Sequence, residues 1–132
     1  MKKILLLDDN LDILQVVEEV LSYEQFEVQS STTCKNFLQV AETFRPDVVI
    51  LDYRLKDGNG GEICQGMKAH HLLKHVPVII FSAYTKPGLN FFDFGCDEVI
   101  FKPFDLDHLL SAIKRLTDKQ QPTKNRQATC YY

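Results

Sequence analysis

Four short, nearly unbroken runs of apolar residues constrain the fold of this 132-residue chain more than any other feature. The runs occupy residues 4–7, 48–51, 78–81 and 99–101. Runs of this length and kind are typical of parallel strands that helices cover on both faces. A weaker strand with alternating polarity is predicted at residues 26–28. The chain therefore has the strands of a largely buried parallel sheet.

Between these runs the apolar residues repeat at helical spacing. The segments 13–21, 34–44 and 106–116 place apolar side chains three or four positions apart, and Asp105 is a suitable N-cap for the last segment. Residues 85–94 contain a proline–glycine turn signal and predict at best a short helix. Strand and helix thus alternate five times, which predicts an α/β fold with a doubly wound, five-stranded parallel sheet and helices on both faces.

Composition and charge agree with one soluble domain and argue against several classes of function. The chain is 45% hydrophobic and 25% charged, as in ordinary globular proteins. A formal net charge of -3 gives no general attraction to nucleic acid or anionic lipid. No apolar run approaches the length of a membrane span, and the first run meets Asp8 and Asp9 before a signal segment is complete. We expect a cytoplasmic protein that binds neither nucleic acid nor membrane.

The cysteines and histidines do not form the pattern of a metal site. The four cysteines, each thirty or more residues from the next, are Cys34, Cys64, Cys96 and Cys130. We interpret them as free thiols. His71 and His75 have the spacing of a helical metal-binding pair next to His70, but Pro77 follows closely and no nearby carboxylate completes a site. We interpret the histidines as a surface helix end, where cationic side chains suit the helix dipole.

Polar residues capable of chemistry follow four of the five predicted strands. They are Asp8 and Asp9, Asp52, Ser82, and Lys102. The carboxyl ends of parallel strands meet at one rim, and with strand order 2-1-3-4-5 the crevice lies between the first and third strands. Three carboxylates there need a cation, and Mg²⁺ prefers such hard oxygen ligands together with a phosphate oxygen. The hydroxyl and the ammonium group can then bind phosphoryl oxygens.

Each of these residues also has a simple structural interpretation. An aspartate after a strand often caps a helix, a serine often starts a turn, and Lys102 before Pro103 can be an exposed lysine. The convergence of all of them at one rim favours a functional site.

Several motifs then resemble the receiver domain of two-component response regulators, in the CheY-like superfamily, over residues 2–118. The motifs are Leu7-Asp8-Asp9-Asn10, residues 48–55 followed by Asp57-Gly58-Asn59-Gly60, Ile80-Phe81-Ser82-Ala83, and Gly95-Cys96-Asp97 leading to Phe101-Lys102-Pro103-Phe104. The intervals are 43 residues from Asp9 to Asp52, 30 to Ser82 and 20 to Lys102, the last a little short for the family. The resemblance implies a flavodoxin-like fold.

The resemblance also implies the roles of the site residues. Asp52 would be the nucleophile that accepts a phosphoryl group and forms an aspartyl phosphate. Asp9, Asp52 and the backbone carbonyl of Arg54 would bind Mg²⁺ directly, and Asp8 would act through a bound water. Lys102 would hold the transferred group.

Signalling partners follow from the same resemblance. Ser82 would be the switch hydroxyl that moves toward the new phosphate and changes partner preference. The donor would be a sensor histidine kinase or a histidine phosphotransfer protein. The output would be binding to a downstream effector protein or to a second copy of the chain in a homodimer. The chain would therefore be a signalling module and not an enzyme.

The sequence departs from the family pattern at several places. Val99 stands where a switching aromatic residue is common, and the segment after Ser82 is about two residues short. That segment carries Phe91, Phe92 and Phe94, which either pack a shortened helix onto the sheet, our preferred interpretation, or form an exposed patch.

Two bulky residues, Arg54 and Tyr84, occupy places that flank the attacking water in dephosphorylation, so we hypothesise a long-lived phosphate. The peptide bond between Lys102 and Pro103 is commonly cis in the family.

Two other functions are weighed against a phosphorylated switch. An aspartate-nucleophile phosphatase would need a D-x-D-x-T/V motif, which Asp52-Tyr53-Arg54 lacks. The nearby glycines Gly58, Gly60 and Gly61 do not have the order of a phosphate-binding loop, and we interpret them as turn-forming. A phosphorylation-independent receiver-fold interaction module remains the alternative. We assign residues 1–118 to the receiver domain and residues 119–132 to a polar tail or truncated linker, and expect a stand-alone receiver or a fragment.

Overall fold

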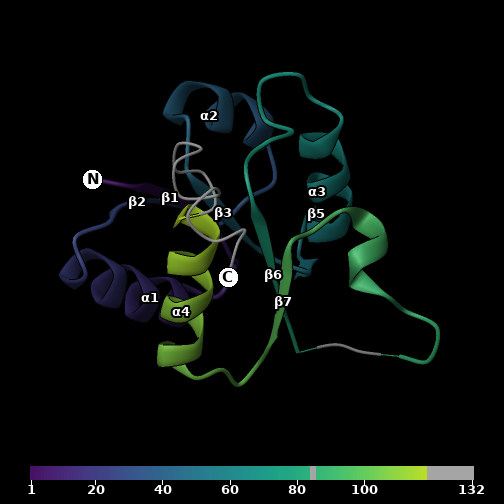
Figure 1. Ribbon diagram of the computed structural model, residues 1–132. Coiled ribbons are helices and arrows are strands. Elements are labelled where there is room, and N and C mark those ends of the chain that lie inside the picture. Colours follow the sequence, from purple (N-terminus) through teal and green to yellow (C-terminus); the bar gives the residue numbers. More distant parts are fainter. Residues whose placement is uncertain (84–85, 119–132) are drawn as a thin grey trace, which may run out of the picture.

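The computed structural model describes residues 1–83 and 86–118, and its centre is a five-stranded parallel sheet (Figure 1). The strands are β1 (Lys3–Leu7), β2 (Glu27–Ser31), β3 (Val48–Asp52), β6 (Val78–Ser82) and β7 (Glu98–Phe101). Their order is β2-β1-β3-β6-β7. Since β6 and β7 are the fourth and fifth strands of this sheet, the predicted order 2-1-3-4-5 is confirmed.

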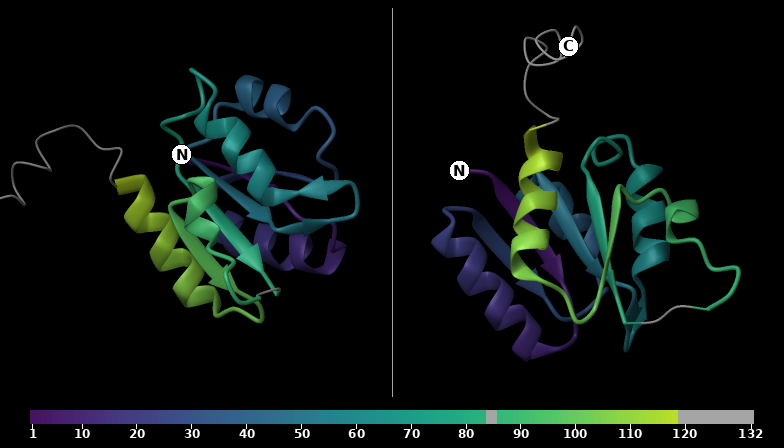
Figure 2. Two further views of the ribbon diagram at one scale, coloured as in Figure 1. Left: turned by 90° about the vertical axis from the view of Figure 1, so that its right-hand side faces the viewer. Right: turned by 60° about the horizontal axis from the view of Figure 1, so that its bottom comes forward.

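Helices cover both faces of the sheet, as the apolar strands require. They are α1 (Leu11–Tyr23), α2 (Phe37–Phe44), α3 (Gly60–Lys68) and α4 (Leu106–Asp118), with a 3₁₀ helix η1 (Phe91–Phe94). Helices α1 and α4 pack on one face, and α2, α3 and η1 pack on the other (Figure 2). This two-sided cover explains why the central strands lack the polar alternation of a half-exposed sheet.

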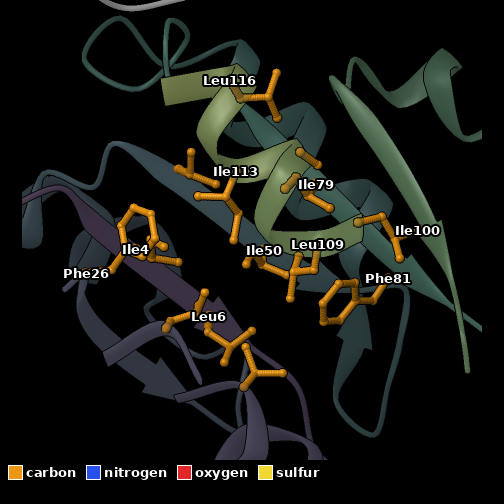
Figure 3. Packing of buried hydrophobic residues seen from close by; sticks show 14 of the residues in the cluster. Ile4, Leu6, Phe26, Ile50, Ile79, Phe81, Ile100, Leu109, Ile113 and Leu116 are labelled. Atoms are coloured by element: carbon orange, nitrogen blue, oxygen red, sulfur yellow. The ribbon is translucent and has the colours of Figure 1, made fainter. Parts of the chain in front are cut away.

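Alternate side chains of each strand fill two separate cores. Ile4 and Leu6 pack with α1 and α4, as Figure 3 shows, whereas Leu5 and Leu7 pack with α2 and α3. All four side chains are fully buried. Because each such burial contributes roughly 1.5–3 kcal/mol, the carboxyl end of β1 is fixed firmly between its neighbours. The residues that follow Leu7 therefore start from a rigid position.

Two details of the strands differ from the sequence-based expectation. The strand predicted at residues 26–28 begins at Glu27 and extends to Ser31 as β2. Phe26 instead enters the core, after Gln25 adopts a positive φ of 72°. A small antiparallel hairpin, β4 (Arg54–Leu55) and β5 (Gly58–Asn59), was not predicted, since two-residue strands leave no periodic signal. The short helix expected within residues 85–94 is η1.

His70, His71 and His75 directly follow the end of α3, which is at Lys68 with Ala69 as its C-cap, so they lie just beyond the predicted helix end and not within the last helical turn. The expectation that no carboxylate lies near them is wrong, because His70 Nε2 is 2.5 Å from Glu42 Oε2 of α2. Sequence distance hides this pair, since packing of α2 beside α3 creates it.

The thiols of Cys34, Cys64 and Cys96 are free, as predicted, and burial raises the pKa of Cys64 to about 12. Among the described residues no helix is long and apolar enough to cross a membrane. The predicted tail with Cys130, and Tyr84, lie outside the described residues.

Candidate functional site

Three carboxylates converge at the carboxyl ends of the neighbouring strands β1 and β3. Asp52 is the last residue of β3, and Asp8 and Asp9 follow β1 directly. One oxygen from each carboxylate lies within 4.8 Å of the others. Asp8 is fully buried and Asp52 is 6% exposed. Two ionised carboxylates at this separation repel by roughly 3 kcal/mol at an effective dielectric constant of 20. The cluster therefore needs positive charge.

Lys102 supplies part of that charge from the other side of the crevice. It follows β7, and its Nζ lies 3.0 Å from Asp8 Oδ2 and 3.3 Å from Asp52 Oδ1. Its backbone N–H donates to the carbonyl of Ser82 at 2.9 Å, and its peptide bond to Pro103 is cis, as expected. The five residues predicted to share the rim are thus brought together: Asp8, Asp9, Asp52, Ser82 and Lys102.

Burial dominates the electrostatics of Asp52. It raises the pKa of this carboxyl from 3.8 to about 6, with a further rise from the charge of Asp8 and a partial reduction from Lys102. A raised pKa means that the folded environment penalises the ionised form. At neutral pH Asp52 is still mainly ionised, and its charge lowers the free energy of unfolding.

Backbone N–H groups orient the other two carboxylates. Asp8 Oδ1 accepts a hydrogen bond from the N–H of Asn10 at 2.9 Å, and Asp9 Oδ2 accepts one from the N–H of Lys56 at 2.9 Å. The Asn10 side chain also caps α1 by accepting from the N–H of Asp12 at 2.9 Å. No role of Asn10 beyond its motif is predicted from the sequence, although the N-cap preference of asparagine is a signal that could have identified it. No sequence signal identifies Lys56, because its backbone makes the contact.

Close packing against β3 explains why one of the three glycine positions after Asp52, Gly60, carries no side chain. A Cβ at Gly60 would lie 2.3 Å from the Asp52 carbonyl oxygen, so a side chain there would displace the end of β3. Its N–H donates to the carbonyl of Tyr53 at 2.8 Å and closes the chain back onto the strand. Gly58 lies in β5 of the hairpin. Gly60 and Gly61 begin α3, and the turn itself consists of Lys56 and Asp57, so the interpretation of these glycines as turn-forming is wrong.

Ser82 and Arg54 occupy the same rim. Ser82 ends β6, is 1% exposed, and comes one residue after Phe81, the neighbour of Asp52 in the sheet. Arg54 begins β4, two residues after Asp52, and its side chain is exposed. These positions agree with the roles that the resemblance implies, which remain predictions.

The phenylalanines after Ser82 divide between the two interpretations. Phe91 is 4% exposed and packs edge-on against Tyr53, with ring centroids 4.9 Å apart. Phe94 lies farther from Tyr53, at 5.9 Å, and is half-buried. Phe92 is 53% exposed. Packing onto the sheet is therefore confirmed for Phe91 and in part for Phe94, and exposure for Phe92. Val99 is half-buried.

The donor set fits a hard divalent cation. All three acidic groups offer oxygen, the element that Mg²⁺ prefers, and their mutual distances allow two or three to reach one ion. None of the described histidines or cysteines joins the cluster. The residues present therefore suit Mg²⁺ better than Zn²⁺, which favours nitrogen and sulfur.

Comparison with known proteins agrees with this geometry. Residues 4–114 match the sequence model of the response regulator receiver domain. The response regulator ArlR of Staphylococcus saprophyticus is 32% identical over 127 residues, which cover 95% of this chain and 56% of that protein. The chain thus spans about half the length of the curated relatives it matches.

Two solved structures share the fold. A CheY-like receiver domain protein from Methanospirillum hungatei is 30% identical, with a TM-score of 0.82 over 91% of this chain and 96% of that one. The receiver domain of the sensor histidine kinase PA1611 from Pseudomonas aeruginosa, solved with a magnesium ion in its active site cleft, is 25% identical, with a TM-score of 0.81 over 89% of this chain and 98% of that one. The chain therefore belongs to the receiver domains of two-component response regulators.

Proposed function

We propose that this receiver domain is a phosphorylation-dependent switch in which Asp52 accepts the phosphoryl group of a phosphohistidine. The observation that carries the proposal is the placement of Asp52 at the end of β3, between two further carboxylates and the Lys102 ammonium group. A carboxylate nucleophile with a cation on each side of its target suits phosphoryl transfer. We assign this activity to a receiver domain of residues 1–118.

The transfer exchanges one bond to phosphorus for another. An Asp52 oxygen forms the new O–P bond while the N–P bond of the phosphohistidine breaks, and its electron pair returns to the imidazole. Lys102, already 3.3 Å from Asp52 Oδ1, neutralises charge on the transferred group. Ser82 is buried at the end of the adjacent strand, and its hydroxyl donates a hydrogen bond to a phosphoryl oxygen.

The three carboxylates would also hold a divalent cation. Asp9, Asp52 and the Arg54 carbonyl would hold Mg²⁺, with Asp8 acting through water, and the ion supplies charge neutralisation for the transferred group. The carboxylate cluster supports this assignment, and the magnesium-bound receiver domain of PA1611 is a precedent.

The donor would be a sensor histidine kinase or a histidine phosphotransfer protein, and the output a change in binding to an effector protein or to a second copy of the chain. Movement of Ser82 toward the phosphoryl group would pull on the segment that leads to η1, whose Phe91 packs against Tyr53 beside Asp52. That contact supports a path from the phosphorylated residue to the surface near Phe92.

Intact mass after incubation with acetyl phosphate and MgCl₂ tests the proposal. We expect one phosphoryl increment in the wild type, none in Asp52→Ala and none with EDTA. No increment in the wild type would favour a phosphorylation-independent interaction module, for which the exposed Phe92 and Phe101 are the first surface to vary.

A further inference from the structure

Tyr53 joins the end of β3 to η1 through its ring. It directly follows Asp52, and its side chain packs in the core that also contains η1. Its ring meets the ring of Phe91 edge-on, with centroids 4.9 Å apart and an interplanar angle of 85°. The ring of Phe94 lies 5.9 Å from the same ring. Aromatic pairs in such geometry favour the packed arrangement about three- to tenfold beyond the effect of buried area.

Hydrogen bonds of its backbone fix Tyr53 to the sheet. Its N–H donates to the carbonyl of Phe81 in β6 at 2.8 Å, and its carbonyl accepts from the N–H of Gly60 at 2.8 Å. Phe81 is fully buried, and Gly60 is the first residue of α3. The ring of Tyr53 therefore has a fixed position beside Asp52.

Phe91 is buried between this fixed ring and a second ring that is linked to Ser82. The second ring belongs to Phe101 at the end of β7, and its centroid lies 6.1 Å from that of Phe91. Phe101 pairs with Ser82 in the sheet, and the N–H of Lys102 donates to the carbonyl of Ser82 at 2.9 Å. A movement of Ser82 therefore shifts Phe101 against Phe91, whereas Tyr53 is held by the buried part of β6 and by α3.

The short helix η1 depends on side-chain contacts for its position. It has four residues and 3₁₀ geometry, which provides few and weak hydrogen bonds of its own. The carbonyl of Phe91 accepts a hydrogen bond from Cys96 Sγ at 3.4 Å. The ring of Phe94 lies against the start of α3, where a Cβ on Gly61 would come within 2.7 Å of it. Loss of one ring contact therefore changes the balance that holds η1 in place.

We propose that the contact between Tyr53 and Phe91 is a latch that opposes the phosphorylated arrangement of this domain. The inference rests on the proposed function, in which Ser82 moves toward the phosphoryl group on Asp52. That movement shifts Phe91 relative to the fixed ring of Tyr53, so the edge-on contact is weakened or lost in the phosphorylated state. A weaker latch then raises the fraction of molecules already in the switched arrangement. By linkage, a ligand that favours this arrangement binds more tightly by the same factor.

NMR titration of the full chain with beryllofluoride, a stable mimic of the phosphoryl group, measures the strength of the latch. The mimic is formed from BeCl₂ in excess NaF and is added in the presence of MgCl₂. We expect its dissociation constant to fall about three- to tenfold in Tyr53→Leu, which removes the ring. Tyr53→Phe keeps the ring and should stay within twofold of the wild type. Phe44→Leu removes a ring of α2 from the same core and should also stay within twofold.

Phe91→Leu tests the same contact from its other side and should tighten binding to a similar extent. The double variant Tyr53→Leu/Phe91→Leu should bind no more tightly than either single variant, because both changes remove one contact. The amide resonance of Phe92 is a second readout that needs no mimic. In Tyr53→Leu it should lie on the line between the free and mimic-bound positions of the wild type, whereas a purely structural disturbance would move it off this line.

Equal affinity in the wild type and Tyr53→Leu overturns the latch and leaves the phosphorylation of Asp52 intact, as does equal tightening in Tyr53→Phe or Phe44→Leu. A double variant whose affinity gain is the product of the two single gains also overturns it, because the two rings then act independently. Absence of both mimic binding and the phosphoryl increment in the wild type overturns both proposals.

Discussion

Replacement of the phosphoacceptor should stabilise the metal-free protein at neutral pH. The change is Asp52→Asn, which keeps the shape of the side chain and removes its charge. Burial and the charge of Asp8 raise the pKa of Asp52 from 3.8 to about 6, so the folded state disfavours the ionised form that predominates at pH 7.5. Asparagine avoids this penalty.

The size and pH range follow from the same shift. Each pKa unit corresponds to 1.36 kcal/mol, which sets a ceiling of about 3 kcal/mol, and because the rim opens to water we expect about 1–2 kcal/mol. Because the pKa of Asp52 is higher in the folded state, protonated Asp52 stabilises the wild type fully only below about pH 4. This contribution to the free energy of unfolding is lost as the pH rises to about 6. The advantage of Asp52→Asn should therefore be largest above pH 7 and vanish near pH 4.

Urea denaturation in EDTA at pH 7.5 and pH 4.5 measures this difference. Groups that titrate identically in both proteins cancel in the comparison. Asp93→Asn, at an exposed carboxylate of η1, is the control, and should change stability by less than about 0.5 kcal/mol at both pH values. If Asp52→Asn is no more stable than the wild type at pH 7.5, or if its advantage is as large at pH 4.5 as at pH 7.5, the conclusion that folding disfavours the ionised form of Asp52 is refuted.

Three further outcomes follow from the same site. Gly60→Ala should cost about 2–3 kcal/mol in urea unfolding and reduce labelling by acetyl phosphate, because its Cβ would meet the Asp52 carbonyl oxygen at 2.3 Å; Gly66→Ala, whose Cβ would lie 3.4 Å from the Leu38 side chain, should gain up to about 1 kcal/mol from helix propensity. Lys102→Met should cost about 3 kcal/mol at pH 7.5 and less at pH 5, since it leaves buried carboxylates unpaired; equal stability at pH 7.5 would contradict this. MgCl₂ at ten times its dissociation constant should stabilise the wild type by about 1.4 kcal/mol in thermal unfolding. Unchanged stability after addition of MgCl₂ would argue against the site.

The stabilising effect expected of Asp52→Asn shows why this carboxylate is kept. A buried charge that costs stability persists where chemistry needs it, and such sites are common among functional residues. Lys102 neutralises the carboxylates only in part, because it lowers the pKa of Asp52 without restoring it to its ordinary value. The remaining imbalance is what a divalent cation or a phosphoryl group with its cation would relieve.

Much of the fold was predictable because its signals are local. Each apolar run is a strand, and the runs in β1, β3 and β6 are buried on both faces, whereas Phe101 of β7 is exposed. The parallel order follows from the alternation with helices. The rim was predictable for the same reason, since Asp52 and Lys102 stand at strand ends that a parallel sheet must bring together. The extent of β2 was missed because its exposed edge residues carry no apolar pattern.

The contacts that sequence could not predict are those made by groups common to nearly every residue or by helices packed side by side. His70 meets Glu42 only because α2 lies beside α3. Asp9 and Lys56 are separated by 47 positions, and the donor is a backbone N–H that every residue except proline possesses. A site of this kind combines side chains that a motif reveals with backbone groups that only the folded hairpin brings into place.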